Sequence, residues 1–313
     1  MDNPFIKLLK KKTCILDGAT GTNLQKFGLS GCPEAWVLEH PQALADLQRS
    51  YVQAGSQAIY TCTLGANRIK LDEYGLSQEA VDINRRLVQL TREAVGPNIF
   101  VGGDVGPTGL FVQPFGDLDF ETAVDCFKEQ ITALAEAGVD FIVIETMIDM
   151  QEARAALIAA RECCDLPVLV SMTYERSGRT LTGTDARTAL ITLQSLGADA
   201  VGCNCSTGPQ EMVGLIQAMR PYAKVPLLVK PNAGLPVARD GVTLFDMDPE
   251  AFVFWMQRLY DAGASVLGGC CGTTPGHIQK LSKSLSNQPR PNRRTAPFSA
   301  LTSSMQTVFV GGR

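Results

Sequence analysis

The sequence predicts an α/β protein, a single-domain (β/α)8 TIM barrel with a linker-like arm at its C-terminal end. Eight short apolar segments alternate with longer segments of helical periodicity, which implies parallel strands joined by right-handed crossovers. The length of 313 residues and the 45% hydrophobic content suit a barrel, which fills roughly 250 residues or more. An open doubly wound sheet is the alternative, but no convincing G-x-G-x-x-G follows the first strand.

The predicted strands and helices follow one another in strict alternation. Strands are expected at 13–17, 58–63, 99–104, 140–145, 167–173, 199–203, 226–230 and 265–270. Helices are expected at 41–54, 78–95, 120–137, 150–163, 186–196, 210–219 and 249–262. Asp149 and Asp248 precede two of these helices as candidate N-caps. Gly138, Gly197 and Gly263 each lead from a helix into a strand, which is typical of a left-handed helix end.

The chain divides into two parts at about residue 286. We expect residues 1–286 to form the (β/α)8 barrel, and residues 287–313 to form an arm or linker. The arm is rich in Pro, Arg, Ser and Thr and has no helical period. Its final "TVFVGG" indicates the start of a strand, which either packs on the barrel or leads into a further part of a longer polypeptide.

Composition excludes several classes of function. Lys and Arg total 28 against 32 Asp and Glu, so nothing favours binding to nucleic acid or to an anionic membrane. No apolar run approaches the roughly 18 residues of a transmembrane helix, and no secretory signal follows the first residues. The ten cysteines are therefore expected to be thiols or metal ligands in a reducing cytoplasm. Two histidines leave little room for a histidine metal site or a Ser-His-Asp triad.

Three cysteines at the predicted strand ends form a candidate metal site. Cys205 follows the sixth strand, and Cys270 and Cys271 end the eighth, so all three belong to the rim where barrel enzymes place their active sites. Three thiolates with one open position are typical of catalytic Zn²⁺. Adjacent residues in a regular strand point to opposite faces, so both sulfurs reach one ion only if the flanking glycines bend the backbone.

Other interpretations of these cysteines stay open. Free cysteine often fills a hydrophobic core, and a strained vicinal disulfide between Cys270 and Cys271 is a further alternative. Cys163–Cys164 serves as an internal comparison: it closes a helix, lacks flanking glycines and has no partner cysteine at the rim. Cys205 is preferred to Cys203 as the third ligand because it lies further beyond its strand.

Two carboxylates also stand at strand ends. Asp17 and Glu145 end the first and fourth predicted strands, where solvated loop acids or helix caps are the plain alternative. Together at one mouth they suit a bound ammonium, and the glycines after Asp17, Gly18 first, offer backbone N–H groups to a carboxylate. A cation partner, an anion cradle and a thiolate-bound zinc suit an amino acid that carries a thiol.

The motifs "LDGATGTNL", "ETMIDMQEA", "GCNCSTGP", "PNAGLP" and "GGCCGTTPGHI" resemble those of the homocysteine S-methyltransferase family, in the family's order. Within it, the chain most resembles the N-terminal homocysteine-binding module of cobalamin-dependent methionine synthase. The resemblance implies one Zn²⁺ per chain on Cys205, Cys270 and Cys271. It also implies that Asp17, Gly18 and Glu145 bind the amino acid part of homocysteine.

The implied reaction is methyl transfer to the thiol of L-homocysteine, which gives methionine. The metal would bind that thiol as a thiolate, so no protein base is needed. The sequence has no cobalamin-binding D-x-H-x-x-G, so a methylcobalamin donor would arrive on a separate corrinoid-carrying domain or protein.

Two alternatives remain at this stage. A free-standing enzyme would use S-methylmethionine or a betaine, although 7% aromatic residues give little to bind a quaternary ammonium. A non-catalytic barrel stabilised by zinc would close the site with a fourth ligand such as Cys203. Cys203→Ser would then damage the protein, whereas it is harmless at a catalytic site.

Overall fold

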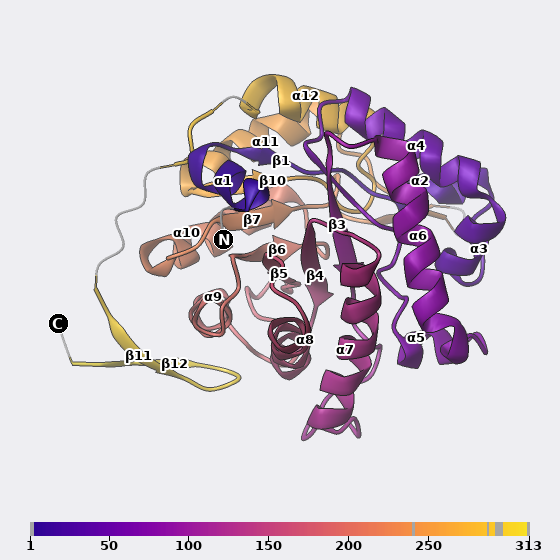
Figure 1. Ribbon diagram of the computed structural model, residues 1–313. Helices are drawn as coiled ribbons and strands as arrows, with labels where there is room; N and C mark the ends of the chain where they lie inside the picture. Colours follow the sequence, from indigo (N-terminus) through magenta and orange to yellow (C-terminus); the bar gives the residue numbers. More distant parts are fainter. Residues whose placement is uncertain (1–2, 240–241, 287, 292–296, 312–313) are drawn as a thin grey trace.

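The protein folds into a ring of eight parallel strands surrounded by helices, as seen in a computed structural model (Figure 1). It describes residues 3–239, 242–286, 288–291 and 297–311. The sheet order is β1-β10-β7-β6-β5-β4-β3-β2, which confirms the predicted TIM barrel. The strands are β1 Cys14–Ile15, β2 Ala58–Tyr60, β3 Phe100–Val105, β4 Phe141–Met147, β5 Val168–Met172, β6 Ala200–Asn204, β7 Leu227–Lys230 and β10 Ala264–Leu267.

The barrel closes between β1 and β2, which form the two ends of the hydrogen-bonded order. Gln57 makes the joint with its main chain and its side chain. Its N–H donates to the carbonyl of Ile15 (2.7 Å), and its Oε1 accepts from the N–H of Ile15 (3.1 Å). Nearer the C-terminal ends of these strands, the N–H of Tyr60 donates to Oδ2 of Asp17 (2.8 Å). One main-chain hydrogen bond and two side-chain hydrogen bonds therefore join β1 to β2, which have no regular strand pairing with each other. We call this junction the seam.

The outer layer consists of α4 Pro41–Gln53, α6 Ala80–Val95, α7 Phe120–Glu136, α8 Met150–Cys163, α9 Ala186–Ser195, α10 Pro209–Met219, α11 Pro249–Ala262 and α12 Pro275–Leu285. The seven predicted helices agree to within two residues at each end. Asp149 and Asp248 cap α8 and α11 by accepting backbone N–H bonds, as expected. The glycines after α7, α9 and α11 have positive φ, which confirms the predicted helix ends.

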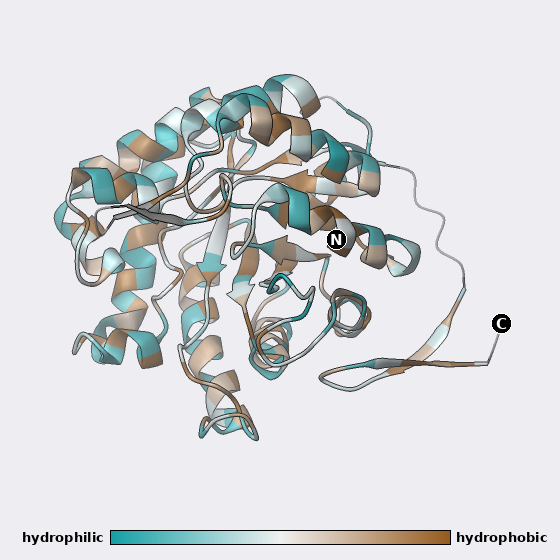
Figure 2. Ribbon diagram, turned by 180° about the vertical axis from the view of Figure 1, so that it is seen from behind, coloured by the Kyte–Doolittle hydropathy of each residue, from teal (hydrophilic) through white to brown (hydrophobic). Residues whose placement is uncertain are grey.

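Two hydrophobic cores hold the barrel together. One lies between strands and outer helices, and the other fills the barrel with alternate strand residues such as Leu16, Val143 and Leu228. Helix α1 (Pro4–Lys11) closes the N-terminal end of this interior. Its Phe5 stacks on Phe141 with ring centroids 4.1 Å apart. The sequence analysis did not predict α1. Figure 2 shows the division, with hydrophobic strands inside and hydrophilic outer helix faces.

Several shorter elements complete the described chain. They are α2 Gly21–Leu24, α3 Pro33–Glu39, α5 Arg68–Asp72, and an antiparallel pair, β8 Val237–Arg239 with β9 Val242–Leu244, after β7. None of the described helices is long and apolar enough to cross a membrane.

The arm contains an antiparallel hairpin, β11 Ser299–Thr302 with β12 Thr307–Val310, beside α9 (Figure 1). Thr307 hydrogen-bonds Thr188 (2.9 Å between hydroxyl oxygens), and Phe309 stacks on Tyr222 at 5.2 Å. The strand expected from "TVFVGG" is therefore present and packs on the barrel. Residues 287, 292–296 and 312–313 of the predicted arm lie outside the described residues, and the domain boundary at 286 stays a prediction.

Candidate active site

The polar residues at the C-terminal rim follow from the alternation of side chains along each strand. Phe141 and Val143 point into the barrel, so Glu145 does so at the next inward position. The same count from Leu228 brings in Lys230. These positions border a cavity of about 520 Å³, in the range of small-molecule sites. Its lining includes Asp17, Gly18, Tyr60, Asp104, Glu145, Cys205, Lys230, Cys270 and Cys271.

The three predicted metal ligands converge at this cavity. The sulfur atoms of Cys205, Cys270 and Cys271 all lie within 4.8 Å of one another, and those of Cys205 and Cys271 are 3.9 Å apart. A tetrahedral zinc with bonds of about 2.3 Å to sulfur requires about 3.8 Å between sulfurs. The donor set therefore fits zinc in both chemistry and spacing. Within the described residues, no other group of His, Cys, Asp and Glu meets the same criterion.

Backbone geometry brings the adjacent cysteines to one place. Strand β10 ends at Leu267, and the N–H of Cys270 donates to the carbonyl of Pro231 (2.8 Å). Gly272 has a φ of +79°, and a Cβ there would lie 2.2 Å from the Cβ of Phe245. This confirms that a glycine bend accompanies the pair. Cys205 itself has a φ of +58°, a left-handed conformation that is costly for a side chain of this kind.

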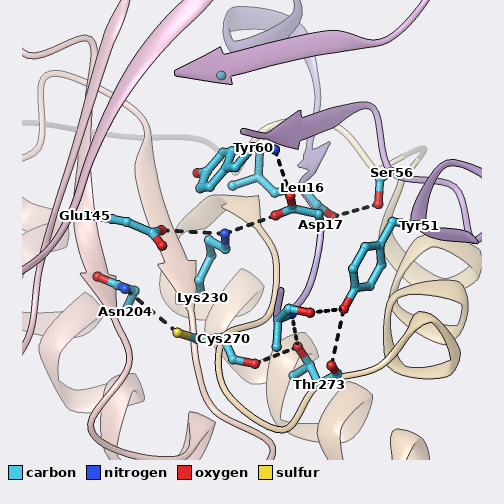
Figure 3. Close-up of polar contacts among 12 residues, drawn as sticks. Leu16, Asp17, Tyr51, Ser56, Tyr60, Glu145, Asn204, Lys230, Cys270 and Thr273 are labelled. Atoms are coloured by element: carbon cyan, nitrogen blue, oxygen red, sulfur yellow. Dashed lines mark hydrogen bonds and ion pairs between the residues drawn. The ribbon is translucent and has the colours of Figure 1, made fainter. Parts of the chain in front are cut away.

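Asn204 ties the ends of β4, β5 and β6 together beside the sulfurs. Its Oδ1 accepts hydrogen bonds from the N–H of Thr146 (2.9 Å) and the hydroxyl of Ser171 (2.7 Å). Its Nδ2 donates to the hydroxyl of Thr146 (2.8 Å) and lies 4.0 Å from the sulfur of Cys270 (Figure 3). Together these contacts hold the end of β6, which leads into Cys205, against the ends of β4 and β5.

The three thiols differ in acidity because they hydrogen-bond one another. Hydrogen bonds from Cys270 and Cys271 lower the pKa of the Cys205 thiol to about 3. The bond to Cys205 conversely raises the pKa of Cys270 to about 12. Cys205 is therefore the most acidic thiol of the cluster, and its close contact with the other two sulfurs is the cause.

Lys230 lies at the centre of the cavity floor, between two carboxylates (Figure 3). Its Nζ donates to Oδ1 of Asp17 (3.1 Å), lies 3.6 Å from Oε2 of Glu145, and sits 3.6 Å from the ring centroid of Tyr60. Burial opposes its charge, but Asp17 and Glu145 outweigh that effect and raise the pKa of Lys230 well above its ordinary value. Burial raises the pKa of Glu145 to about 7, although Lys230 opposes this shift.

The structure thus places all six predicted site residues around one cavity. Gly18 lies where a Cβ would be 2.7 Å from the hydroxyl of Tyr51, so only glycine fits without a shift. The substrate contacts of Asp17, Gly18 and Glu145 remain predictions. The sequence analysis gave no role to Lys230, Asp104, Tyr60 or Asn204. Counting alternate residues from the apolar strand cores would have found them.

Comparison with known proteins decides the family. The sequence model described as homocysteine S-methyltransferase matches residues 14–285. The chain belongs to this family. It is 30% identical over 328 residues to a methionine synthase of Mycobacterium tuberculosis (strain ATCC 25618 / H37Rv), which covers 98% of this chain and 27% of that protein. A methionine synthase of Mycobacterium leprae (strain TN) is 30% identical over 316 residues, or 95% of this chain and 26% of that protein. The chain spans about a quarter of these relatives.

Solved structures of the homocysteine S-methyltransferase family share the fold. The metallated form of the homocysteine methyltransferase MmuM from Escherichia coli superposes with a TM-score of 0.75 at 24% identity, over 88% of this chain and 97% of that one. Its oxidized form gives 0.76 at 23% identity, over 91% and 100%. The family is one of methyltransferases, and the predicted resemblance is confirmed at that level.

Proposed function

We propose that this chain transfers a methyl group to the thiol of L-homocysteine, giving methionine, with one zinc ion held by Cys205, Cys270 and Cys271. The observation that carries the proposal is the convergence of three sulfurs within 4.8 Å beside a cavity lined by buried carboxylates. The family match and the existence of a metallated form of the Escherichia coli enzyme support it.

The three cysteines would hold the zinc and leave one coordination position open, since no further His, Cys, Asp or Glu among the described residues joins the cluster. When bound, zinc would take the substrate thiol as a thiolate and so supply a nucleophile at neutral pH. Cys203, the suggested fourth ligand of a closed structural site, is fully buried within β6 and outside the cluster. This favours catalysis over a non-catalytic, zinc-stabilised barrel.

The amino acid part of homocysteine would lie over the loop after β1. Glu145 faces the cavity with Oε2, which accepts no hydrogen bond and has only the longer 3.6 Å contact with Nζ of Lys230, so it can accept the substrate ammonium. Asp17 acts through Lys230, which it holds in place. Gly18 leaves space for close approach of the ligand to the backbone. Holding the amino acid at Glu145 and at the backbone of Gly18 would orient its thiol toward the sulfur cluster.

The methyl donor is proposed to be a methylcorrinoid on a separate domain or protein, because the relatives are methionine synthases of which this chain spans about a quarter. S-methylmethionine and a betaine are the alternatives. A betaine needs an aromatic cage, but the cavity lining offers only Tyr60 and Tyr74 among the described residues. The face of Tyr60 is already covered by Lys230. We place the reaction in the cytoplasm, where the thiols stay reduced.

Elemental analysis of anaerobically purified protein, followed by donor screening, tests the proposal. We expect about one zinc per chain, and methionine formation from homocysteine with free methylcobalamin as the surrogate donor. If homocysteine is methylated only by S-methylmethionine or glycine betaine, that compound replaces the methylcorrinoid as the proposed donor. Protein that takes up no zinc and forms no methionine with any of the three donors would overturn it.

A further inference from the structure

Three buried oxygen atoms on the cavity wall have no hydrogen-bond partner. They are Oδ1 of Asp104, Oε2 of Glu145 and the hydroxyl of Tyr60, and their residues are 3–7% exposed. All three residues line the cavity next to the sulfur cluster. Buried carboxylate oxygens without partners are rare because they forfeit the hydration they had in water. Oε2 of Glu145 still has the ammonium of Lys230 at 3.6 Å, so Asp104 is the carboxylate on this wall that lacks a cationic partner among the described residues.

Asp17 differs from these residues because both of its oxygens are engaged. Oδ2 accepts the N–H of Tyr60 at 2.8 Å, and Oδ1 accepts Nζ of Lys230 at 3.1 Å. Lys230 is closer to Asp17 than to Glu145, which lies 3.6 Å away. Lys230 therefore pairs closely with Asp17 and more loosely with Glu145, whereas Asp104 forms no ion pair among the described residues.

Asp104 and Glu145 lie on neighbouring parallel strands. Asp104 pairs with Val143 in the register of β3 and β4, so the two carboxylates occupy successive inward positions around the rim. Burial first, and then the charge of Glu145, raise the pKa of Asp104 well above its ordinary value. A cation placed between them would relieve both effects.

We propose that Lys230 is a resident counter-ion that withdraws Asp17 from direct substrate contact, so that the ammonium of the substrate binds between Glu145 and Asp104 near the hydroxyl of Tyr60. This inference rests on the proposed function and assigns two positioning residues, Lys230 and Asp104, to it.

Lys230 is poorly placed to bind the substrate carboxylate instead. Its ammonium has three donors, and the structure directs them toward Asp17, Glu145 and the ring face of Tyr60. Its side chain is only 4% exposed. A carboxylate approaching Lys230 would also meet the charges of Asp17 and Glu145.

Calorimetric binding of two ligands tests the role of Asp104. L-Homocysteine carries the ammonium, and 4-sulfanylbutanoic acid lacks it but keeps the thiol and the carboxylate. In the full chain, Asp104→Asn should weaken homocysteine binding about 10- to 100-fold, as expected for loss of a charge-assisted bond. The same change should alter binding of 4-sulfanylbutanoic acid by less than about threefold. Asp104→Ser and the exposed control Glu73→Gln, both checked by thermal unfolding, separate binding from folding.

A double-mutant cycle tests the role of Lys230. In a Lys230→Met background Asp17 becomes free to take the ammonium, so Asp104→Asn should then cost less than about threefold in homocysteine affinity. Lys283→Met, on the exposed side of α12, is the matched control and should leave the full effect of Asp104→Asn in place.

Several outcomes would overturn the inference. One is equal weakening of both ligands by Asp104→Asn. A second is loss of ligand discrimination on Asp17→Asn but not on Asp104→Asn. A third is weaker binding of 4-sulfanylbutanoic acid to Lys230→Met, which would make the lysine a carboxylate receptor. If the unmodified protein binds no homocysteine at all, the proposed function fails rather than this inference alone.

Discussion

Cys270–Cys271 and Cys163–Cys164 are the same dipeptide in two different regions of the barrel. The first follows β10 at the C-terminal rim, where a third thiol from the loop after β6 meets it. The second closes α8 on the outer layer, and the sulfur of Cys164 bonds the carbonyl of Ala160 at 3.4 Å. Both pairs are partly accessible, so exposure does not separate them.

The difference lies in what surrounds each pair. At the rim, a glycine allows the backbone to bend, and the sulfur of Cys205 joins the pair. The three sulfurs then lie within 4.8 Å of one another, a spacing that suits a metal ion. On the helix, the bond from Cys163 lowers the pKa of Cys164 to about 6 without a third ligand. The rim pair therefore has the backbone bend and the third sulfur that a zinc site requires, whereas the helix pair has no third sulfur.

The largest expected effect comes from removing one sulfur from each pair. Cys271→Ala should lose the zinc and reduce methyl transfer by at least about 100-fold, since two thiolates hold zinc far more weakly than three. Cys164→Ala is the matched control and should retain about one zinc per chain with unchanged turnover. Metal analysis and initial rates decide the matter. Equal zinc in both variants would make the rim pair ordinary core packing.

An intermediate effect is expected in thiol reactivity. With zinc bound, the thiol alkylated fastest by iodoacetamide should be Cys164, and its rate should fall as the pH drops below about 6 because the thiolate becomes protonated. Removing zinc with a chelator should add alkylation of the rim cysteines and leave the rate at Cys164 unchanged. Peptide mapping by mass spectrometry reports both. Protection of Cys164 by zinc would contradict the proposed assignment of the two pairs.

The smallest effect is expected at Cys203, which lies one strand position from Asn204 but is fully buried. Cys203→Ala should lower the free energy of unfolding by about 1–2 kcal/mol through lost packing. Alanine avoids burying the hydroxyl that serine would introduce. Zinc content should not change. If the variant lost both its zinc and its stability, the result would instead support a closed structural zinc site with Cys203 as the fourth ligand.

The sequence predicted the parts of the structure that depend on local chemistry. Helix bounds followed from periodicity, whereas the strands predicted at 58–63 and 265–270 end three residues earlier in the structure. Asp149 and Asp248 marked helix starts that the structure contains. The three cysteines could be placed at one rim because parallel strands share an end.

Other features depend on distant contacts that no local pattern encodes. Helix α1 owes its place to Phe5, which stacks on Phe141 far along the chain. The pairing of Lys230 with Asp17 joins residues 213 positions apart, so a lysine after an apolar strand gave no indication of its partner. The expectation that Asp17 and Glu145 face a bound ammonium was made without Lys230. The structure places that lysine between them.

The seam between β1 and β2 links ligand recognition to the integrity of the ring. Asp17 both holds the ammonium of Lys230 and accepts the amide proton of Tyr60, so one carboxylate joins the cavity floor to the only strand pair lacking a ladder among the described residues. Hydrogen–deuterium exchange at the Tyr60 amide should therefore report on the site. Exchange should be slow while Asp17 accepts this amide proton, and faster when that hydrogen bond breaks.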